Sequence, residues 1–195
     1  MAAGHIEVIC GPMFSGKTEE LIRRLRRAQI ARQRVVVFKP KIDDRYHESD
    51  IVSHSSQRLE SIPIEHASEI EPVVRRLEPQ VIGVDEAQFF RGDLVEVCER
   101  LADAGIRVLA AGLDLDYRGQ PFGPIPRLLA VAEFITKQLA VCMVCGAPAA
   151  RSQRVSWALG AASEEQVLVG ATEAYEARCR RCFVHDVDVP SAPRP

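Results

Sequence analysis

Long apolar runs, aromatic side chains and net charge are all scarce in this sequence of 195 residues. No run approaches the roughly 18 apolar residues of a transmembrane helix, so no membrane contact is expected. The first residues lack the basic and apolar parts of a signal peptide, which favours a cytoplasmic location. Aromatic residues make up only 6% and the formal net charge is −2, so the sequence does not predict a nucleic-acid partner.

Disulfide bonds are also not expected, because the cytoplasm keeps thiols reduced, and the six cysteines are therefore interpreted by their spacing. Cys142 and Cys145 form one C-x-x-C pair, and Cys179 and Cys182 form a second pair after 33 intervening residues. Four thiolates complete a tetrahedral zinc site and leave no position for a substrate, which predicts structural Zn²⁺. Two unrelated pairs or a redox dithiol are the alternatives, and no thioredoxin-like context surrounds either pair.

Short β-branched runs alternate with helical stripes of apolar residues before residue 141. This alternation predicts an α/β fold with a mostly parallel sheet flanked by helices. After that point the strands become short, and alanine and glycine accumulate. The expected strands lie at 6–10, 35–38, 81–84, 106–111 and about 134–140; the expected helices lie at 18–33, after 65, around 94–101 and at about 127–132; residues 41 to about 59 are expected to form a loop.

The eight residues after the first expected strand match the P-loop pattern G-x-x-x-x-G-K-[ST]: Gly11-Pro12-Met13-Phe14-Ser15-Gly16-Lys17-Thr18. Backbone N–H groups of such a loop surround phosphate oxygens, and the following helix N-terminus adds positive potential. We expect Lys17 to reach the β- and γ-phosphates of ATP and Thr18 to hold Mg²⁺. A chance turn is the alternative, but the flanking strand and helix are those the mechanism requires. The sequence thus predicts a P-loop NTPase-like domain over 1–140, a zinc-binding lobe with a lasso loop over 141–189, and a disordered tail over 190–195.

Asp85 and Glu86 stand at the end of the strand expected at 81–84. In a P-loop enzyme an Asp at such a strand end binds Mg²⁺, and neighbouring side chains on a strand point to opposite faces. We therefore expect Asp85 to serve the metal ion and Glu86 to act as the base that takes a proton from the attacking group. An acidic pair that caps the next helix is the alternative. The pattern leaves open whether the attacking group is a hydroxyl or water.

The P-loop, the run Asp85-Glu86-Ala87-Gln88-Phe89-Phe90, the pair Leu113-Asp114 followed by Pro121-Phe122-Gly123, and the two C-x-x-C pairs together resemble the cytosolic-type (type II) thymidine kinase family. Their order and spacing match from about residue 6 to residue 183. The resemblance implies transfer of the γ-phosphate of ATP to the 5′-hydroxyl of thymidine, giving dTMP for nucleotide salvage, with Glu86 as the general base.

The resemblance also implies the residues around the two substrates. ATP would be bound by the P-loop together with Asp43, Asp44, Arg45, Asp85, Glu86, Ala87 and Gln88. Thymidine would contact Met13, Phe89, Leu113, Tyr117, Phe122, Ser152, the lasso segment Gln166-Val167-Leu168-Val169-Gly170, and Tyr175. Without the resemblance, Phe89, Leu113 and Phe122 would be interpreted as residues of the hydrophobic core.

The family further implies a homotetramer, slower phosphorylation of deoxyuridine, and inhibition of some members by the end product dTTP.

Three functions other than that of a thymidine kinase are also considered. A nucleic-acid-dependent ATPase with a zinc ribbon would need a basic, aromatic face, which the composition does not favour. A non-catalytic nucleotide sensor would need no base, and Glu86 argues against it. A kinase for another nucleoside is opposed only by the resemblance of the pocket residues.

Overall fold

A computed structural model describes residues 4–41, 50–52, 58–90, 92–155 and 175–185. Its centre is a six-stranded sheet with the strand order β5-β2-β6-β7-β1-β8, in which every pair of neighbours is parallel. The α/β prediction is confirmed. The strands of this sheet are β1 (His5–Cys10), β2 (Val35–Pro40), β5 (Ile62–Ile64), β6 (Val81–Val84), β7 (Arg107–Gly112) and β8 (Phe134–Lys137).

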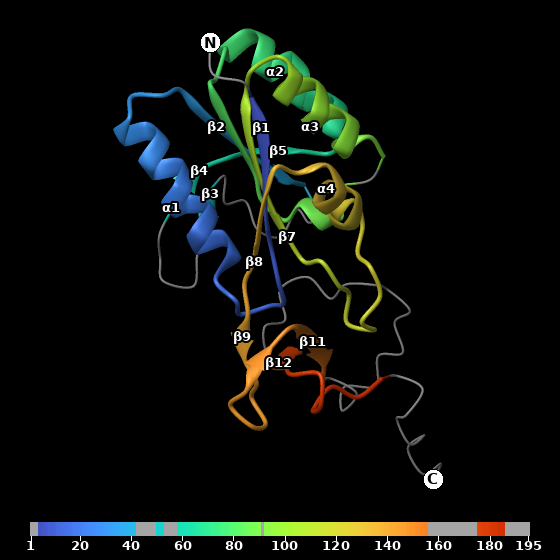
Figure 1. The fold of residues 1–195 in the computed structure, drawn as a ribbon. Helices are drawn as coiled ribbons and strands as arrows, with labels where there is room; N and C mark the ends of the chain where they lie inside the picture. Colours follow the sequence, from blue (N-terminus) through green and yellow to red (C-terminus); the bar gives the residue numbers. More distant parts are fainter. Residues whose placement is uncertain (1–3, 42–49, 53–57, 91, 156–174, 186–195) are drawn as a thin grey trace.

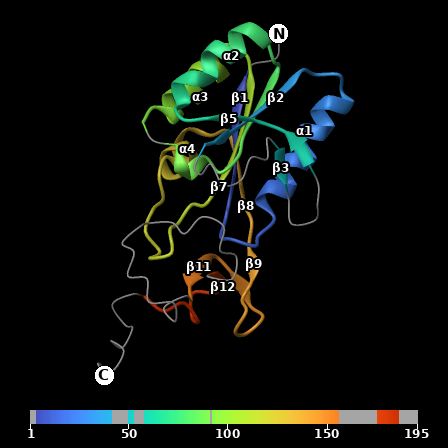
Figure 2. The ribbon, with the colours of Figure 1, turned by 180° about the vertical axis from the view of Figure 1, so that it is seen from behind.

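Helices cover both faces of the sheet, so the fold has three layers (Figures 1 and 2). Within the described residues, α1 (Lys17–Ile30) packs on one face of the sheet. The other face carries α2 (Ile70–Leu77), α3 (Leu94–Asp103) and α4 (Ile125–Val131). Two short 3₁₀ helices, η1 (Ala67–Glu69) and η2 (Ala87–Phe89), follow β5 and β6. No helix in the described ranges is both long and apolar enough to cross a bilayer.

The core consists of two apolar clusters, one on each face of the sheet. Leu21, Ile22 and Leu25 are fully buried on one side of α1, because they recur at the helical spacing that places them on one face. They pack against alternate residues of the strands, such as Ile9 and Leu109. The opposite face of the sheet carries the larger cluster, which includes residues of α2, α3 and α4. This packing holds α1 against the sheet, so it positions the loop that joins β1 to α1.

The prediction of a loop from 41 to about 59 is wrong in part. β3 (Asp50–Val52) and β4 (Arg58–Glu60) form a small antiparallel pair in this segment. β5 adds a further strand beside β2 that was not expected. Each of these strands has only three residues, which is too short for an alternating pattern to stand out in the sequence.

A small lobe lies below the carboxyl ends of the main strands (Figure 1). The single strand expected at about 134–140 is instead divided into β8 and β9 (Ala140–Val141). β9 pairs with β10 (Pro148–Ala149), and β11 (Arg151–Arg154) pairs with β12 (Tyr175–Arg178), both antiparallel. The lobe therefore begins where the main sheet ends, close to the predicted change at residue 141.

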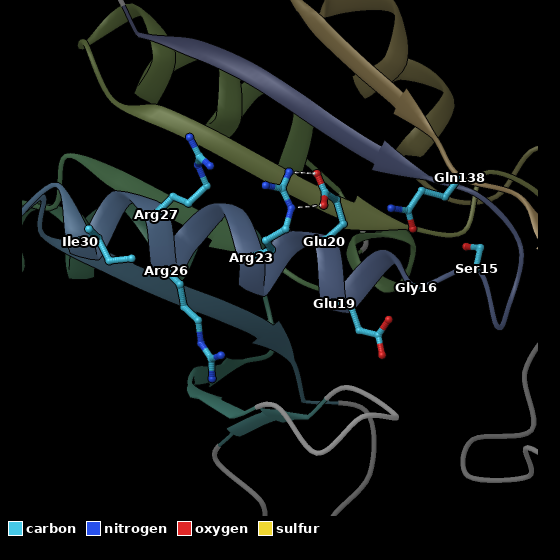
Figure 3. Close-up of a pocket in the computed structure, with 9 residues that line it drawn as sticks. All are labelled: Ser15, Gly16, Glu19, Glu20, Arg23, Arg26, Arg27, Ile30 and Gln138. Atoms are coloured by element: carbon cyan, nitrogen blue, oxygen red, sulfur yellow. Dashed lines mark hydrogen bonds and ion pairs between the residues drawn. The ribbon is translucent and has the colours of Figure 1, made fainter.

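An open groove of about 600 Å³ runs along the exterior of α1 (Figure 3). It begins beside Ser15 and Gly16, follows the helix past Arg23 and Arg26, and ends at Ile30. Ile30 is 82% exposed. The start of the helix is thus open to solvent on the side away from the sheet.

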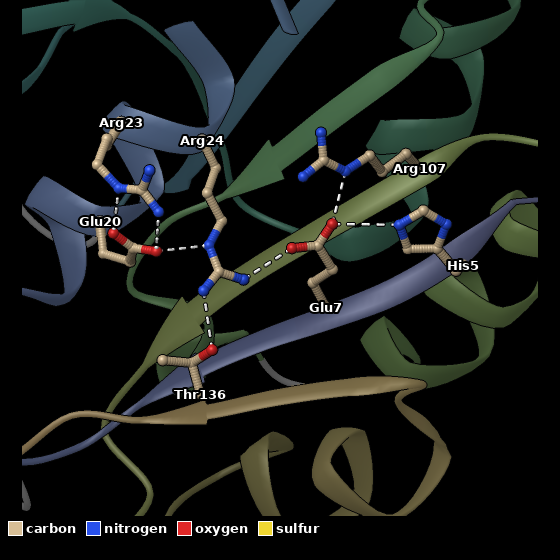
Figure 4. A network of polar contacts seen from close by, with 7 residues as sticks. All are labelled: His5, Glu7, Glu20, Arg23, Arg24, Arg107 and Thr136. Atoms are coloured by element: carbon tan, nitrogen blue, oxygen red, sulfur yellow. Dashed lines mark hydrogen bonds and ion pairs between the residues drawn. The ribbon is translucent and has the colours of Figure 1, made fainter. Parts of the chain in front are cut away.

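Glu7 lies at the centre of a network of charged residues between α1 and the sheet (Figure 4). Its side chain is 8% exposed and accepts hydrogen bonds from Arg107 Nε at 2.6 Å and from Arg24 at 2.7 Å. Arg24 also donates to Glu20 at 2.7 Å and to Thr136 Oγ1 at 2.8 Å. One guanidinium therefore connects α1 to β1 and to β8.

Removing the central carboxylate should destabilise the fold. Glu7→Gln leaves Arg107 without its carboxylate partner and Arg24 with Glu20 alone, and breaking a buried ion pair in this way costs about 3 kcal/mol. Chemical denaturation at pH 7 measures the loss. The matched control is Arg127→Gln, whose partner Glu96 lies in a surface pair with side chains 62% and 42% exposed, and this change should cost far less than Glu7→Gln because water screens an exposed pair. Equal losses in both variants would contradict the assignment.

The same network should make stability depend on pH. Burial alone would raise the pKa of Glu7, but hydrogen bonds from Arg107 and Arg24 outweigh it, and the pKa lies below its ordinary value of 4.5. A carboxylate with a lowered pKa stabilises the folded state above pH 4.5 and loses that contribution as the pH falls toward the folded-state pKa. The stability difference between the wild type and Glu7→Gln should therefore shrink in acid, and a constant difference from pH 7 to pH 3 would contradict this.

Candidate active site

The P-loop connects β1 to α1 at the carboxyl edge of the sheet. Gly16 precedes the helix with φ 80°, a left-handed conformation that glycine adopts without steric cost. Within the loop, Ser15 Oγ and Lys17 Nζ both donate to the carbonyl oxygen of Pro12 at 2.8 Å. The predicted strand, loop and helix are present in the predicted order, with the loop leading into the N-terminus of α1, where a helix favours an anion.

Lys17 interacts with two carboxylates, those of Asp85 and Glu86, which follow β6. Removal from water lowers the pKa of Lys17, and the charges of Glu86 and Asp85 oppose that change. An ammonium group that has lost most of its hydration interacts strongly with a phosphate placed beside it. The position of Lys17 is therefore suited to a polyphosphate.

Asp85 is buried at the end of β6 and faces the start of α1. Its Oδ1 atom lies 3.4 Å from Thr18 Oγ1 and accepts the backbone N–H of Glu86 at 3.0 Å. Burial, reinforced by the charge of Glu86, raises the pKa of Asp85 to about 7. A hydroxyl and a carboxylate at this separation are two oxygen ligands of the kind that Mg²⁺ prefers.

Glu86, unlike the buried Asp85, is exposed. Its backbone has φ 49° and ψ 39°, a left-handed conformation that is uncommon for residues other than glycine. Gln88 Nε2 donates to Glu86 Oε2 at 2.5 Å. The two acidic side chains thus have different partners, and the left-handed turn at Glu86, not strand alternation, separates them, because β6 ends at Val84.

Several residues expected to line a nucleoside pocket lie close together. Tyr117 and Tyr175 are both 7% exposed and pack with Met13 of the P-loop. Ser152 Oγ accepts the backbone N–H of Met13 at 2.9 Å, although 139 residues separate the two in the sequence. Strands β11 and β12 of the small lobe therefore contact the phosphate loop directly.

The other expected pocket residues lie along the loops that follow β6 and β7. The rings of Phe89 and Phe122 meet edge to face with centroids 5.6 Å apart. Leu113 donates its backbone N–H to Gln88 Oε1 at 3.0 Å, and Ala87 is fully buried. The expected residues Asp43, Asp44, Arg45, Gln166, Val167, Leu168, Val169 and Gly170 lie outside the described ranges.

Sequence reasoning missed two cationic contacts and one ion pair at this site. The guanidinium carbon of Arg118 lies 5.1 Å from the centre of the Tyr117 ring, and that of Arg154 lies 5.3 Å from it. Lys137 Nζ lies 2.5 Å from Asp114 Oδ2 and so joins the ends of β8 and β7. The contacts of Arg154 with Tyr117 and of Lys137 with Asp114 join separate elements of the fold, so no spacing in the sequence pairs them, and the adjacent pair Tyr117-Arg118 has no recognisable motif.

Ser152 offers a direct test of the contact between the small lobe and the P-loop. Ser152→Ala removes the acceptor of the Met13 N–H, and leaving this partly buried donor unsatisfied costs about 1–3 kcal/mol. The free energy of unfolding should fall by that amount. Ser152→Thr, which keeps the hydroxyl, should recover most of it. Equal losses in both variants would show that packing, not the hydrogen bond, matters here.

The four predicted zinc ligands lie together in the small lobe. All four Sγ atoms lie within 4.8 Å of one another, with Cys145 Sγ 3.7 Å from Cys179 Sγ and 3.5 Å from Cys182 Sγ. These separations are far longer than a disulfide bond. They match the edge of about 3.8 Å that a tetrahedral site with Zn–S bonds of about 2.3 Å requires. The donor set and its geometry therefore fit structural zinc.

Comparison with known proteins agrees with this arrangement. The family model described as Thymidine kinase matches residues 4–183. The chain is 56% identical over 182 residues to a thymidine kinase of Rhodothermus sp. (strain ITI 518), covering 93% of this chain and 82% of the relative. It is 54% identical over 188 residues to a thymidine kinase of Bdellovibrio bacteriovorus (strain ATCC 15356 / DSM 50701 / NCIMB 9529 / HD100), covering 96% and 89%. The chain belongs to the thymidine kinase family.

Proposed function

We propose that this protein transfers the γ-phosphate of ATP to the 5′-hydroxyl of thymidine and releases dTMP and ADP for nucleotide salvage. Membership of the family supports the reaction. The observation that carries the proposal is that the Glu86 carboxylate lies beside Lys17 and Asp85, next to the phosphate loop. A base next to a phosphate site is what phosphoryl transfer to a hydroxyl needs.

In the proposed reaction, Glu86 takes the proton of the 5′-hydroxyl as its oxygen attacks the γ-phosphorus. The bond between the γ-phosphorus and the β–γ bridging oxygen breaks, and ADP leaves with that electron pair. Lys17 and the loop N–H groups bind the phosphates. Thr18 and Asp85 would hold Mg²⁺, which neutralises charge on the β- and γ-phosphates when bound. Zinc held by the four cysteines has no open position and serves only the structure of the lobe.

We assign residues 1–140 to ATP and residues 141–189 to a zinc-binding lobe that helps to cover thymidine. Met13, Tyr117, Ser152 and Tyr175 are proposed as thymidine contacts because they form one cluster across the two parts. Phe89, Leu113 and Phe122 are proposed as the rest of the lining. Deoxyuridine is proposed as a slower acceptor, dTTP as a feedback inhibitor, and a homotetramer as the assembly.

The test is phosphate transfer from labelled ATP with Mg²⁺ to thymidine, deoxycytidine, deoxyadenosine or deoxyguanosine, with a control that lacks an acceptor. We expect labelled product with thymidine and not with the other three. ATP turnover without an acceptor, or only when nucleic acid is added, would exclude the proposal. Labelled product mainly with another nucleoside would support kinase activity but exclude thymidine as the main acceptor.

A further inference from the structure

The side chain of Gln88 connects the proposed catalytic base to the loop that follows β7. Gln88 is 2% exposed. Its Nε2 atom donates to Glu86 Oε2 at 2.5 Å, and its Oε1 atom accepts the backbone N–H of Leu113 at 3.0 Å. Both ends of one buried amide are thus in use, one on the base and one on a residue of the proposed thymidine pocket.

The chemistry of these partners fixes which way the amide faces. A backbone N–H can only donate, so the atom of Gln88 that faces Leu113 must be the carbonyl oxygen. The NH₂ group then has to face Glu86, whose carboxylate is an acceptor. The two hydrogen-bonding partners alone therefore decide which atom of the amide is the oxygen and which is the nitrogen.

The surroundings of Gln88 leave it little room to move. A Cβ atom at Gly123 would lie 2.1 Å from the carbonyl oxygen of Gln88, and a Cβ atom at Gly112 would lie 2.6 Å from its Oε1 atom. Two glycines therefore allow the backbone after β7 to approach Gln88 on both its main-chain and side-chain sides. The loop after β6 and the loop after β7 are held together at this residue.

We propose that Gln88 is a positioning residue for Glu86. Its NH₂ group holds Oε2 of the carboxylate and so directs Oε1 toward the 5′-hydroxyl, while its carbonyl oxygen ties that arrangement to the loop at Leu113. Glu86 is exposed and carries no such restraint from its own backbone neighbours, so the amide supplies the orientation. The inference rests on the proposed function and adds a residue that acts on the base and not on the substrate.

Two substitutions of similar size separate orientation from packing. Gln88→Met fills the same space but neither donates nor accepts a strong hydrogen bond, and misorienting the base should lower kcat about 100-fold with little change in the KM for ATP. Gln88→Glu keeps the shape but places a second carboxylate against Glu86. Two such groups share a proton, so the acidic limb of the kcat profile should move up by about one pH unit or more.

Other charged groups that face Glu86 must be accounted for in that profile. Lys17 from α1 and Asp85 from the end of β6 both interact with the charge of Glu86. Neither is altered in the Gln88 variants. A movement of the acidic limb in Gln88→Glu that is absent from Gln88→Met therefore reports on position 88, because a purely structural defect would move both variants alike.

The experiment compares kcat, the KM values for thymidine and ATP, and pH profiles of the wild type, Gln88→Met and Gln88→Glu. Gln29→Met is the control, since Gln29 is exposed at the far end of α1. Thermal unfolding and ATP binding are measured for each variant, and the pH profile of Gln88→Glu remains informative if Gln88→Met fails to fold. Failure of the wild type to phosphorylate thymidine would exclude the proposed function. An active wild type with an unchanged kcat in Gln88→Met, or an unmoved acidic limb in Gln88→Glu, would exclude the positioning role alone.

Discussion

Replacing Glu86 by glutamine is expected to lower kcat for thymidine about 10²- to 10⁴-fold, the usual contribution of a general base. The amide has almost the same shape but cannot take the proton of the 5′-hydroxyl. Lys17 and Thr18 are untouched, so ATP should bind with nearly unchanged affinity. Such a loss in kcat without a loss in binding is what removal of a group needed only in the transition state produces.

The measurement is steady-state phosphate transfer together with ATP binding by calorimetry. Glu99→Gln is the matched control, because it makes the same exchange at an exposed position of α3. Its kcat should equal that of the wild type. Near-normal turnover in Glu86→Gln would show that Glu86 is not the general base, even if the protein phosphorylates thymidine.

Loss of the zinc site is expected to abolish thymidine binding while ATP still binds. Ser152 belongs to β11 and Tyr175 to β12, the two paired strands of the small lobe. β12 ends at Arg178, and the next residue along the chain is the zinc ligand Cys179. A structural zinc site contributes on the order of 10 kcal/mol to the folding of a small domain. The lobe has a core of only a few small residues, so it lacks the apolar burial that would replace the metal.

The variant is Cys145→Ser, with Met143→Ser as the control, since Met143 lies between two cysteines and is 64% exposed. Zinc content is measured by atomic absorption, lobe folding by limited proteolysis, and binding of thymidine and ATP by calorimetry. We expect one zinc per chain in the wild type and the control, and cleavage within the lobe of Cys145→Ser. Full thymidine affinity in a zinc-free variant would contradict the role given to the lobe.

The parts of the fold with strong local patterns could be predicted from the sequence. The runs at 6–10 and 81–84 are β-branched and fully apolar or nearly so, and they appear as β1 and β6 within one residue. The glycines of the P-loop and the paired cysteines also have mechanisms tied to fixed spacings. These features depend on residues that are near in the sequence or on chemistry with few alternatives.

The contacts that organise the site could not be predicted in this way. The side chain of Gln88 bonds Glu86 and also reaches Leu113, which lies 25 residues further along the chain than Gln88. Ser152 reaches Met13 across 139 residues. Such pairs depend on which strands become neighbours in the sheet, and no local periodicity records that order. Family resemblance named many of the residues, but not the hydrogen bonds between them.

At position 86 the residue that would make the protein more stable differs from the residue that turnover needs, because the backbone there is left-handed. A residue with a side chain costs about 1 kcal/mol or more in this conformation, whereas glycine accommodates it freely. A library of variants selected only for resistance to heat should therefore accumulate glycine at position 86, and those proteins would fold well and transfer no phosphate. Engineering of this enzyme for durability has to keep position 86 under selection for activity, because the local backbone favours glycine over the glutamate that the chemistry needs.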